Sequence, residues 1–283
     1  MPFDQIAVFG AGTMGHGIAQ VCAMAGIEVR LFDIDDARVD AGLAKVKQNL
    51  DKGVARGKVT EAVCETALKN LTGTSSLADA ADGAEVLIEA IPEKLDLKQA
   101  LFRSLDAVAE PGVIFATNTS SISIAAIAES VSDPSRVIGT HFFNPVHIMK
   151  LLEIVHHPGT ANEVIDGIRA LGEHIGKACI LVRDVPGFAT SRLGVALGME
   201  AIRMLEEGVA SAEDIDKAMV LGYRHPIGPL KLTDLVGLDV RMNIGEYLAE
   251  TLKNPAFQPP ELMRKLVEEG KLGQKSGEGF YRW

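Results

Sequence analysis

Short runs of apolar residues alternate with longer amphipathic stretches over the first two thirds of the chain. The short runs have the length and composition of buried strands, and the stretches between them have the apolar spacing of helices. The predicted strands cover residues 5–10, 27–35, 84–92, 112–120, 136–143, 149–155 and 178–184. This alternation predicts an α/β fold with a mainly parallel sheet and helices on both of its faces.

The pattern changes after residue 184. From residue 187 onward, apolar positions recur only with helical spacing, and glycine and proline interrupt the stretches. We therefore predict an α/β domain over residues 1–185 and an all-helical domain over residues 186–283. A chain of 283 residues is long for one domain and comfortable for two.

Composition and charge narrow the class of protein. Hydrophobic residues make up 47% of the chain and charged residues 23%, as in ordinary globular proteins. A formal net charge of −10 disfavours nucleic acid and anionic membranes as partners, because phosphate neutralisation dominates affinity for both. The first residues lack the basic stretch of a secretory signal, and no apolar run is long enough to span a membrane, so we expect a cytoplasmic protein. The three cysteines lack metal-ligand spacing, so we expect neither a metal site nor a disulfide framework.

A glycine motif follows the first predicted strand. Gly10, Gly12 and Gly15 form G-x-G-x-x-G, a weak pattern alone but a specific one here, because it links a strand to a helix. Gly10 would permit a tight turn, Gly12 the approach of a pyrophosphate, and Gly15 close packing of the helix on the strand. The start of the helix, with Thr13 and Met14, would supply N–H groups to the phosphates. The alternative is a purely structural turn.

The second predicted strand leads to Asp33, which bears on the identity of the dinucleotide. A carboxylate at this place accepts hydrogen bonds from the ribose hydroxyls and repels a 2′-phosphate, which favours NAD over NADP. Ile34, Asp35 and Asp36 offer no cation to a 2′-phosphate, whereas Arg38 does. The alternative is that Asp33 only caps the helix that follows.

His141 and Glu153 are the candidate acid–base pair. Histidine titrates near neutrality, so it can serve both directions of an alcohol oxidation, and His141 lies near the end of an apolar strand, where such sheets bind ligands. Glu153 lies within a buried strand, where a carboxylate needs a partner such as protonated histidine. A His–Glu dyad meets both conditions; in the alternative, the two side chains never meet. His147, His156 and His157 have the character of loop or surface residues.

Four segments resemble the signatures of the L-3-hydroxyacyl-CoA dehydrogenases, most of all the short bacterial 3-hydroxybutyryl-CoA dehydrogenases. They are ATNTSSISI (116–124), GTHFFNPVHIMKLLEIV (139–155), DVPGF (184–188) and KSGEGFY (275–281). The resemblance runs in order along the whole chain. It implies an NAD-dependent oxidoreductase that interconverts an L-3-hydroxyacyl-CoA, such as 3-hydroxybutyryl-CoA, and a 3-ketoacyl-CoA such as acetoacetyl-CoA. It also implies a place in fatty acid metabolism, in beta-oxidation or butanoate metabolism.

The same resemblance implies a function for each domain. Residues 1–185 would form an NAD-binding Rossmann domain with a helical hairpin insertion, and residues 186–283 a helical substrate and dimerisation domain. The active site would lie between the two. Apolar surface on the helices predicted within residues 194–205 and 235–252 also favours a homodimer interface.

Roles for individual residues follow from the resemblance. His141 would be the base and Glu153 its partner. Ser120 would hydrogen-bond the substrate oxygen, and Asn144 would lie beside the nicotinamide and the substrate. All four residues would therefore take part in catalysis, with Ser120 and Asn144 also contacting the cofactor.

Glu93, Lys98 and Lys275 match cofactor-contacting positions of the family. The alternatives are a solvated helix charge for Lys98 and a tail charge for Lys275. Ser121 and Ser123 could instead be hydroxyls that cap turns.

Basic residues concentrate in residues 44–58 (AKVKQNLDKGVARGK). In the family this region forms a helical hairpin that meets the phosphates of CoA. Lys52 and Arg56, at i,i+4 spacing, share one helix face and are the candidates for this contact. The alternative is a solvated basic face.

The chain departs from the family after residue 188. Members usually carry P-G-F-x-x-N-R, whereas this chain has Ser191 in place of the asparagine. The resemblance implies that the asparagine helps to hold the substrate oxygen. A serine hydroxyl is shorter and offers one donor instead of two, so Ser191 would tune substrate binding. Two other functions remain as alternatives. One is a non-catalytic dinucleotide-binding protein, and the presence of His141 and Glu153 argues against it. The other is a dehydrogenase of a free hydroxy acid, and the basic residues of 44–58 argue against it.

Overall fold

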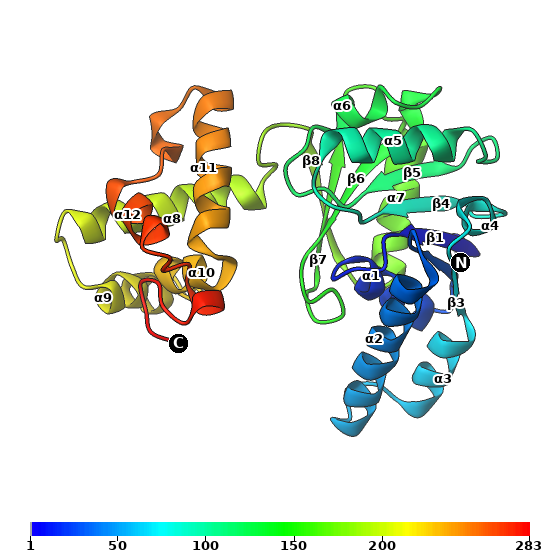
Figure 1. Ribbon diagram of the computed structural model, residues 1–283, viewed down its shortest axis with the longest axis horizontal. Coiled ribbons are helices and arrows are strands. Elements are labelled where there is room, and N and C mark those ends of the chain that lie inside the picture. Colours follow the sequence, from blue (N-terminus) through cyan, green and yellow to red (C-terminus); the bar gives the residue numbers. More distant parts are fainter. Residues whose placement is uncertain (1) are drawn as a thin grey trace. The chain divides into compact units, whose positions relative to one another are not determined.

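The first part of the chain is built on one eight-stranded sheet (Figure 1). The computed structural model describes residues 2–283. The strands are β1 (Gln5–Phe9), β2 (Glu28–Phe32), β3 (Leu71–Thr74), β4 (Val86–Glu89), β5 (Ile114–Thr117), β6 (Val137–Phe142), β7 (Leu151–His156) and β8 (Ala178–Arg183). Their order is β3-β2-β1-β4-β5-β6-β7-β8, and every neighbouring pair is parallel except β6 with β7. The predicted mainly parallel sheet is confirmed.

Strand β3 is the one strand that the hydrophobic pattern does not predict. Its sequence is LTGT, in which Leu71 is buried while Thr72 and Gly73 are exposed, so it contains no apolar run. The strand forms because its backbone pairs in parallel with β2 at the edge of the sheet. Short edge strands of this kind depend on a neighbouring strand, which sequence spacing does not reveal.

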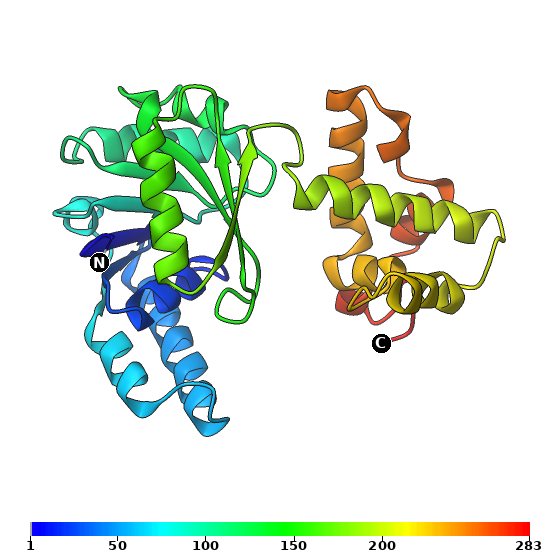
Figure 2. The ribbon, with the colours of Figure 1, turned by 180° about the vertical axis from the view of Figure 1, so that it is seen from behind.

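Helices cover both faces of the sheet. They are α1 (Gly15–Met24), α2 (Asp36–Ala55), α3 (Glu61–Lys69), α4 (Leu77–Ala81), α5 (Leu95–Asp106), α6 (Ile124–Ala128) and α7 (Asn162–His174). Helices α5 and α6 lie over one face (Figure 1), and α7 lies over the opposite face (Figure 2). Helices α2 and α3 lie side by side as a hairpin that also contacts α1. The apolar face of α1, with Ile18 and Cys22, is fully buried against the sheet.

The sheet has a topological switch point between β1 and β4. From β1 the chain adds β2 and β3 to one side, and from β4 it adds β5 and β6 to the other. Ligands of open α/β sheets bind at such a point, outside the carboxyl ends of the strands. The loops after β1, β4, β5 and β6 all leave this edge, and all carry residues predicted to bind or react.

The chain divides after Asp184, and residues 185–283 form a second, helical unit. Its helices are α8 (Thr190–Glu206), α9 (Ala212–Lys217), α10 (Pro229–Val236), α11 (Leu238–Leu252) and α12 (Glu261–Glu268). The core of this unit lies around α8 and α11, with Met199, Ile202 and Leu248 among its buried side chains. Buried Asp234 holds the C-terminal segment by accepting hydrogen bonds of 2.9 Å from the backbone N–H of Phe280 and the indole N–H of Trp283.

Three features of the described residues bear on partners. None of the helices in residues 2–283 is both long and apolar enough to cross a membrane. Within the same residues, no group of three His, Cys, Asp or Glu side chains could hold a metal ion. Cys22, Cys64 and Cys179 are unpaired thiols.

Candidate active site

The loop between β1 and α1 has the shape of a phosphate cradle. Gly10 has a φ of 104°, and a Cβ there would lie 2.7 Å from the carbonyl oxygen of Ala90. A Cβ at Gly15 would collide with the carbonyl oxygen of Gly10. A Cβ at Gly12 would meet nothing within 4 Å, so packing explains the first and third glycines but not the second. The open space at Gly12 adjoins the start of α1, where N–H groups bind anions, and a dinucleotide pyrophosphate fits there.

Thr13 and Met14, also predicted to contact the cofactor, lead directly into this helix. Thr13 is exposed, and Met14 is the last residue before the helical turn that begins at Gly15. No acidic residue lies in the first turn of α1 to occupy its N–H groups. The helix start is thereby left with a positive end that suits a phosphate.

A cavity of about 630 Å³ adjoins the glycine loop. Gly12 lies on one side, and apolar side chains that include Phe32 and Leu101 form the walls. Its volume falls within the roughly 300–1,000 Å³ typical of small-molecule sites. Asp33 and Arg38 also line it. An apolar cavity with a carboxylate beside a phosphate cradle fits the adenosine half of a dinucleotide.

Asp33 faces this cavity instead of capping the next helix. Its Oδ2 accepts a hydrogen bond of 2.8 Å from the N–H of Ala11, and its Oδ1 accepts one of 2.8 Å from the N–H of Ile34. The cap of α2 is Asp35, whose Oδ1 accepts from the N–H of Arg38, so the capping alternative for Asp33 is wrong. The Arg38 guanidinium lies 3.8 Å from the Asp33 carboxylate.

His141 and Glu153 face each other across the antiparallel pair of β6 and β7. The strand register places them directly opposite, and His141 Nδ1 lies 2.8 Å from Glu153 Oε2. His141 is 8% exposed and Glu153 is fully buried. Because an ionised carboxylate can only accept, Nδ1 carries the hydrogen and the lone pair of the neutral ring is at Nε2. The Phe143 ring packs against the imidazole, with 4.3 Å between centroids, and helps to fix its plane.

Ser120 lies in the loop after β5, and Glu93 holds that loop in place. Glu93 Oε1 accepts hydrogen bonds from the N–H of Ser120 at 2.8 Å and from the hydroxyl of Thr119 at 2.6 Å. The Ser120 hydroxyl also donates to Glu93, at 3.2 Å. Asn118 Oδ1 accepts from the N–H of Phe142 at 2.9 Å, which ties this loop to the end of β6. Asn118 is thus a site residue that the sequence did not single out.

Lys98 is buried between two carboxylates. Its Nζ lies 2.6 Å from Glu89 Oε1 and 3.2 Å from Glu93 Oε2, and its side chain is 1% exposed. The alternative of a solvated helix charge is therefore wrong. Burial raises the pKa of the Glu89 carboxyl, although Lys98 and the Thr117 hydroxyl oppose this. Burial also acts to raise the pKa of Glu93, but Lys98 and the hydrogen bond from Thr119 outweigh it and hold that pKa below its usual value.

The other predicted residues of the first unit are exposed. Asn144 lies in the loop after β6, next to Pro145. Lys52 lies in the last turn of α2 and Arg56 directly follows that helix. Within residues 2–283, neither Lys52 nor Arg56 has a carboxylate oxygen within 4.0 Å. Both are therefore available to an anionic ligand.

Two predicted residues belong to the second unit. Lys275 Nζ makes two contacts with the Asp239 carboxylate, at 2.6 and 2.7 Å, so it is a paired residue and not a loose tail charge. Ser191 is the second residue of α8 and is half-buried.

Two further residues have structural roles. Ser123 caps α6 by accepting from the N–H of Ala126, and its hydroxyl donates to Asp184 at 2.8 Å. His157, interpreted as a loop or surface residue, lies in the loop after β7 but is only 6% exposed, and its Nε2 lies 2.9 Å from the carbonyl oxygen of Pro134. The loop position agrees with the interpretation, whereas the ring is buried, because the turn after β7 folds it back against the preceding loop.

Comparisons with known proteins agree with this geometry. Residues 5–185 match the family model described as 3-hydroxyacyl-CoA dehydrogenase, NAD binding domain, and residues 187–283 match that of the C-terminal domain. A 3-hydroxybutyryl-CoA dehydrogenase of Mycobacterium tuberculosis is 42% identical over 282 residues, which are 99% of this chain and 98% of that protein. The mitochondrial hydroxyacyl-coenzyme A dehydrogenase of Sus scrofa is 41% identical, over 98% of this chain and 90% of its own length. The solved structure of (S)-3-hydroxybutyryl-CoA dehydrogenase from Ralstonia eutropha has a TM-score of 0.96 and 41% identity, with 99% of each chain covered.

Proposed function

The chain belongs to the 3-hydroxyacyl-CoA dehydrogenase family, and we propose that it interconverts a short-chain L-3-hydroxyacyl-CoA, such as 3-hydroxybutyryl-CoA, and the matching 3-ketoacyl-CoA. It is an NAD-dependent enzyme, since the family model over residues 5–185 is an NAD-binding domain. The observation that carries the proposed chemistry is the buried pair of His141 and Glu153, 2.8 Å apart at the ligand-binding edge of the sheet. Relatives that are named for 3-hydroxybutyryl-CoA support the short acyl chain.

The reaction removes one hydride and one proton from a secondary alcohol. When bound, NAD⁺ supplies the acceptor for the C3 hydride and its electron pair. In the oxidative direction, His141 takes the hydroxyl proton at Nε2, and Glu153 stabilises the resulting imidazolium at Nδ1. In the reductive direction, the imidazolium returns this proton to the alkoxide oxygen. The Ser120 hydroxyl, held in place by Glu93, orients the same oxygen, and Asn144 lies beside it in this proposal.

The substrate also requires a site for CoA phosphates. Lys52 and Arg56 are exposed cations at the end of α2 and remain our candidates for that contact. Glu93, Lys98 and Lys275 are assigned to the cofactor side of the site, where Lys98 acts by fixing the charge and position of Glu93.

The proposed function is tested by NADH consumption with three kinds of substrate. We expect turnover of acetoacetyl-CoA, slower turnover of longer 3-ketoacyl-CoAs, and none of free acetoacetate. Turnover of free acetoacetate alone would favour the free hydroxy acid alternative. NADH binding without turnover of any compound would favour a non-catalytic dinucleotide-binding protein.

We infer a reducing, cytoplasmic compartment and a place in fatty acid or butanoate metabolism. Three unpaired thiols support the compartment, because thiols of secreted proteins are usually paired. The acyl-CoA substrate supports the metabolic assignment.

Asp33→Asn is expected to weaken NADH binding about 10- to 100-fold, because hydrogen bonds to charged groups contribute about 1.5–3 kcal/mol. The variant should also discriminate less against NADPH, since Arg38, 3.8 Å from the carboxylate, becomes available to a 2′-phosphate. Fluorescence titration with both cofactors measures the two dissociation constants. Asp35→Asn, which alters the α2 cap outside the cavity, is the control. A wild type that already prefers NADPH contradicts this assignment.

Ser191→Asn is expected to raise kcat/KM for acetoacetyl-CoA by no more than about tenfold, the range that a neutral hydrogen bond of about 0.5–1.5 kcal/mol covers. The physical reason is the longer side chain and second donor of asparagine. Steady-state assays of the wild type and of Ser191→Asn measure the two values of kcat/KM. A wild type inactive on every 3-ketoacyl-CoA, together with restored turnover in Ser191→Asn, would remove the catalytic assignment.

A homodimer through residues 187–283 is expected at micromolar concentration. The second unit exposes large apolar side chains that include Leu193, Leu221 and Tyr223, whose exposed fractions are 71%, 76% and 76%. Where exposed apolar side chains gather into one patch, they commonly mark an interface. Light scattering across a concentration series measures the mass, and a single species of about 30.2 kDa at all concentrations contradicts the prediction.

A further inference from the structure

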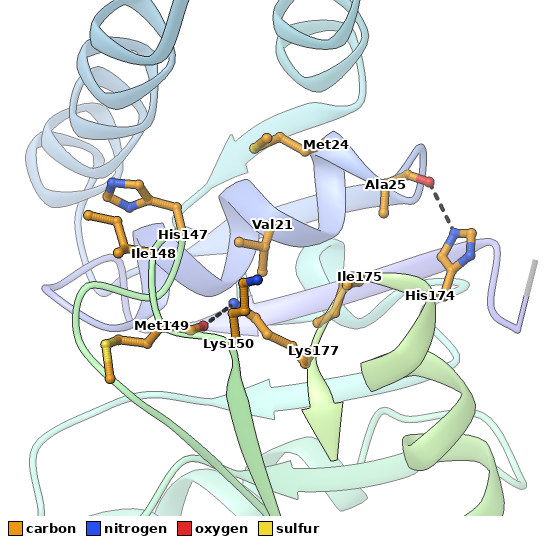
Figure 3. A pocket seen from close by; sticks show the side chains of 11 residues that line it. Val21, Met24, Ala25, His147, Ile148, Met149, Lys150, His174, Ile175 and Lys177 are labelled. Atoms are coloured by element: carbon orange, nitrogen blue, oxygen red, sulfur yellow. Dashed lines mark hydrogen bonds between the residues drawn. The ribbon is translucent and has the colours of Figure 1, made fainter. Parts of the chain in front are cut away.

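A second cavity of the first unit shares no lining residue with the dinucleotide cavity. Its volume is about 390 Å³, and it lies between the end of α1, the loop after β6 and the turn between α7 and β8 (Figure 3). Four basic side chains line it, and no Asp or Glu does. We call it the basic pocket, defined by His147, Lys150, His174 and Lys177.

The four basic groups have no acidic partner. Within residues 2–283, no carboxylate oxygen lies within 4.0 Å of any of them. Lys177 is 9% exposed, and its Nζ donates only to backbone carbonyls, those of Val146 and, at 2.8 Å, Met149. His174 Nε2 lies 3.0 Å from the carbonyl oxygen of Ala25. In a chain with a net charge of −10, a cavity with cations and without a carboxylate is an exception to the overall charge.

The basic groups in and around the basic pocket repel one another when they are protonated. Burial lowers the pKa of the Lys177 ammonium. Burial also lowers the pKa of His147, and the positive charges of His16 and Lys177 lower it further. A bound anion would relieve this repulsion and favour the protonated forms. The lowered pKa values of Lys177 and His147 and the arrangement of basic side chains around the cavity therefore both favour an anionic ligand.

The walls of the pocket are apolar. Val21 and Met24 come from α1, Ile148 and Met149 from the loop, and Ile175 from the turn before β8 (Figure 3). Methionine side chains adapt to flat or irregular ligands. The volume lies in the range of roughly 300–1,000 Å³ that small-molecule sites occupy and leaves room beyond one phosphate.

We propose that the basic pocket binds a phosphate-bearing ligand of nucleotide size, with the phosphate on Lys150, His147 and Lys177 and an apolar part against the α1 side chains. This chemistry has two sources. One is the nucleotide end of the CoA thioester, an assignment that rests on the proposed function and would replace Lys52 and Arg56 at the end of α2 as the contact for its phosphates. The other is a separate phosphate compound that binds independently of the substrate.

The probe that tests binding is adenosine 3′,5′-bisphosphate, the nucleotide end of CoA. It is titrated calorimetrically into the full chain with NADH saturating, so that the dinucleotide site is filled. The variant His147→Gln/Lys150→Gln removes the exposed Lys150 ammonium and the exposed His147 imidazole and leaves buried Lys177 in place, which limits damage to the fold. We expect at least about tenfold weaker binding, since hydrogen bonds to charged groups are the stronger class. Lys265→Gln, an exposed lysine of α12, is the matched control and should bind as the wild type does.

Kinetics of the same variants separate the two sources. The KM for acetoacetyl-CoA is compared with that for acetoacetyl-pantetheine, which lacks the nucleotide. A KM that rises about tenfold for the first substrate and not for the second assigns the pocket to the nucleotide end of CoA. Unchanged KM values for both, with weakened binding of the bisphosphate, assign it to a separate compound.

The proposal is overturned if the wild type does not bind the bisphosphate at millimolar concentration. Equal binding by the wild type and His147→Gln/Lys150→Gln overturns it as well. Failure of the proposed function looks different, because the wild type would then turn over neither thioester while the titration still reported on the pocket.

Discussion

His141→Gln is expected to reduce acetoacetyl-CoA about 10²- to 10⁴-fold more slowly than the wild type, the usual size of general acid–base catalysis. Glutamine retains a polar side chain but cannot hold and return a proton at neutral pH. The dissociation constant of NADH should stay nearly unchanged, because the dinucleotide cavity is lined by other residues. Stopped-flow and steady-state assays give kcat, and fluorescence titration gives NADH affinity.

Glu153→Gln tests whether the pair acts as a unit. Its carboxylate is fully buried and 2.8 Å from His141 Nδ1, so its removal disturbs both the tautomer and the charge of the imidazolium. We expect severe slowing in the single variant and little further loss when it is combined with His141→Gln, because residues that act together are not additive. Near-normal turnover in His141→Gln, or independent and additive losses, contradicts the assignment.

The pairing of these two residues could be anticipated because each lies in an apolar strand. A charged group inside such a strand requires a partner, and the same-face rule of a sheet restricts the choice to opposite positions. The structure places His141 opposite Glu153 in the β6–β7 register. What the sequence did not contain is the direction of β7, since an antiparallel strand in a mainly parallel sheet leaves no mark in hydrophobic spacing.

Contacts between distant segments account for most of what the sequence missed. Lys98 carries the spacing of a helix surface residue, but its position on α5 brings it under Glu89 at the end of β4. Glu89 itself reads as one polar residue in an apolar run. The burial of Lys98 and its contact with Glu89 both depend on how α5 packs against the sheet. Local propensity does not encode that packing.

The residue that caps α2 could not be assigned from the sequence either, although the competing residues are neighbours in the chain. Asp33, Asp35 and Asp36 stand close together, and any of them has the side chain to cap a helix. The structure assigns the cap to Asp35 and leaves Asp33 at the cavity. The choice depends on where the strand ends relative to the first helical turn, and sequence patterns fix such boundaries only loosely.

Lys98→Met is expected to lower the free energy of unfolding by about 3–5 kcal/mol, the usual cost of removing one partner from a buried ion pair. The ammonium is 1% exposed and lies 2.6 Å from a fully buried Glu89 carboxylate. Without it, Glu89 retains the Thr117 hydroxyl and the N–H of Ile91 as partners but loses its only nearby cation among residues 2–283. The Glu93 carboxylate loses the same ammonium, so NADH binding should weaken as well.

The free energy of unfolding of Lys98→Met must be measured in the first unit, which contains Lys98. The single tryptophan, Trp283, lies in the second unit, so its fluorescence does not follow unfolding around β4 and β5. Hydrogen exchange of the β4 and β5 amides gives the local free energy of opening instead. Lys98→Met/Glu89→Gln is the matched variant, because it removes both charges, and it should recover much of the loss. Equal exchange rates in the wild type and Lys98→Met contradict the buried-pair argument.

The pH dependence of the difference between Lys98→Met and Lys98→Met/Glu89→Gln isolates Glu89. Burial raises the pKa of this carboxyl even with Lys98 present, and loss of the ammonium raises it further. The folded state then binds more protons than the unfolded state, so stability falls as pH rises above the unfolded value of about 4.3. We therefore expect the single variant to match the double variant near pH 4 and to become progressively less stable than it toward neutrality. A difference that is constant over this range would mean that Glu89 stays charged without Lys98 and that the two hydrogen bonds alone stabilise it.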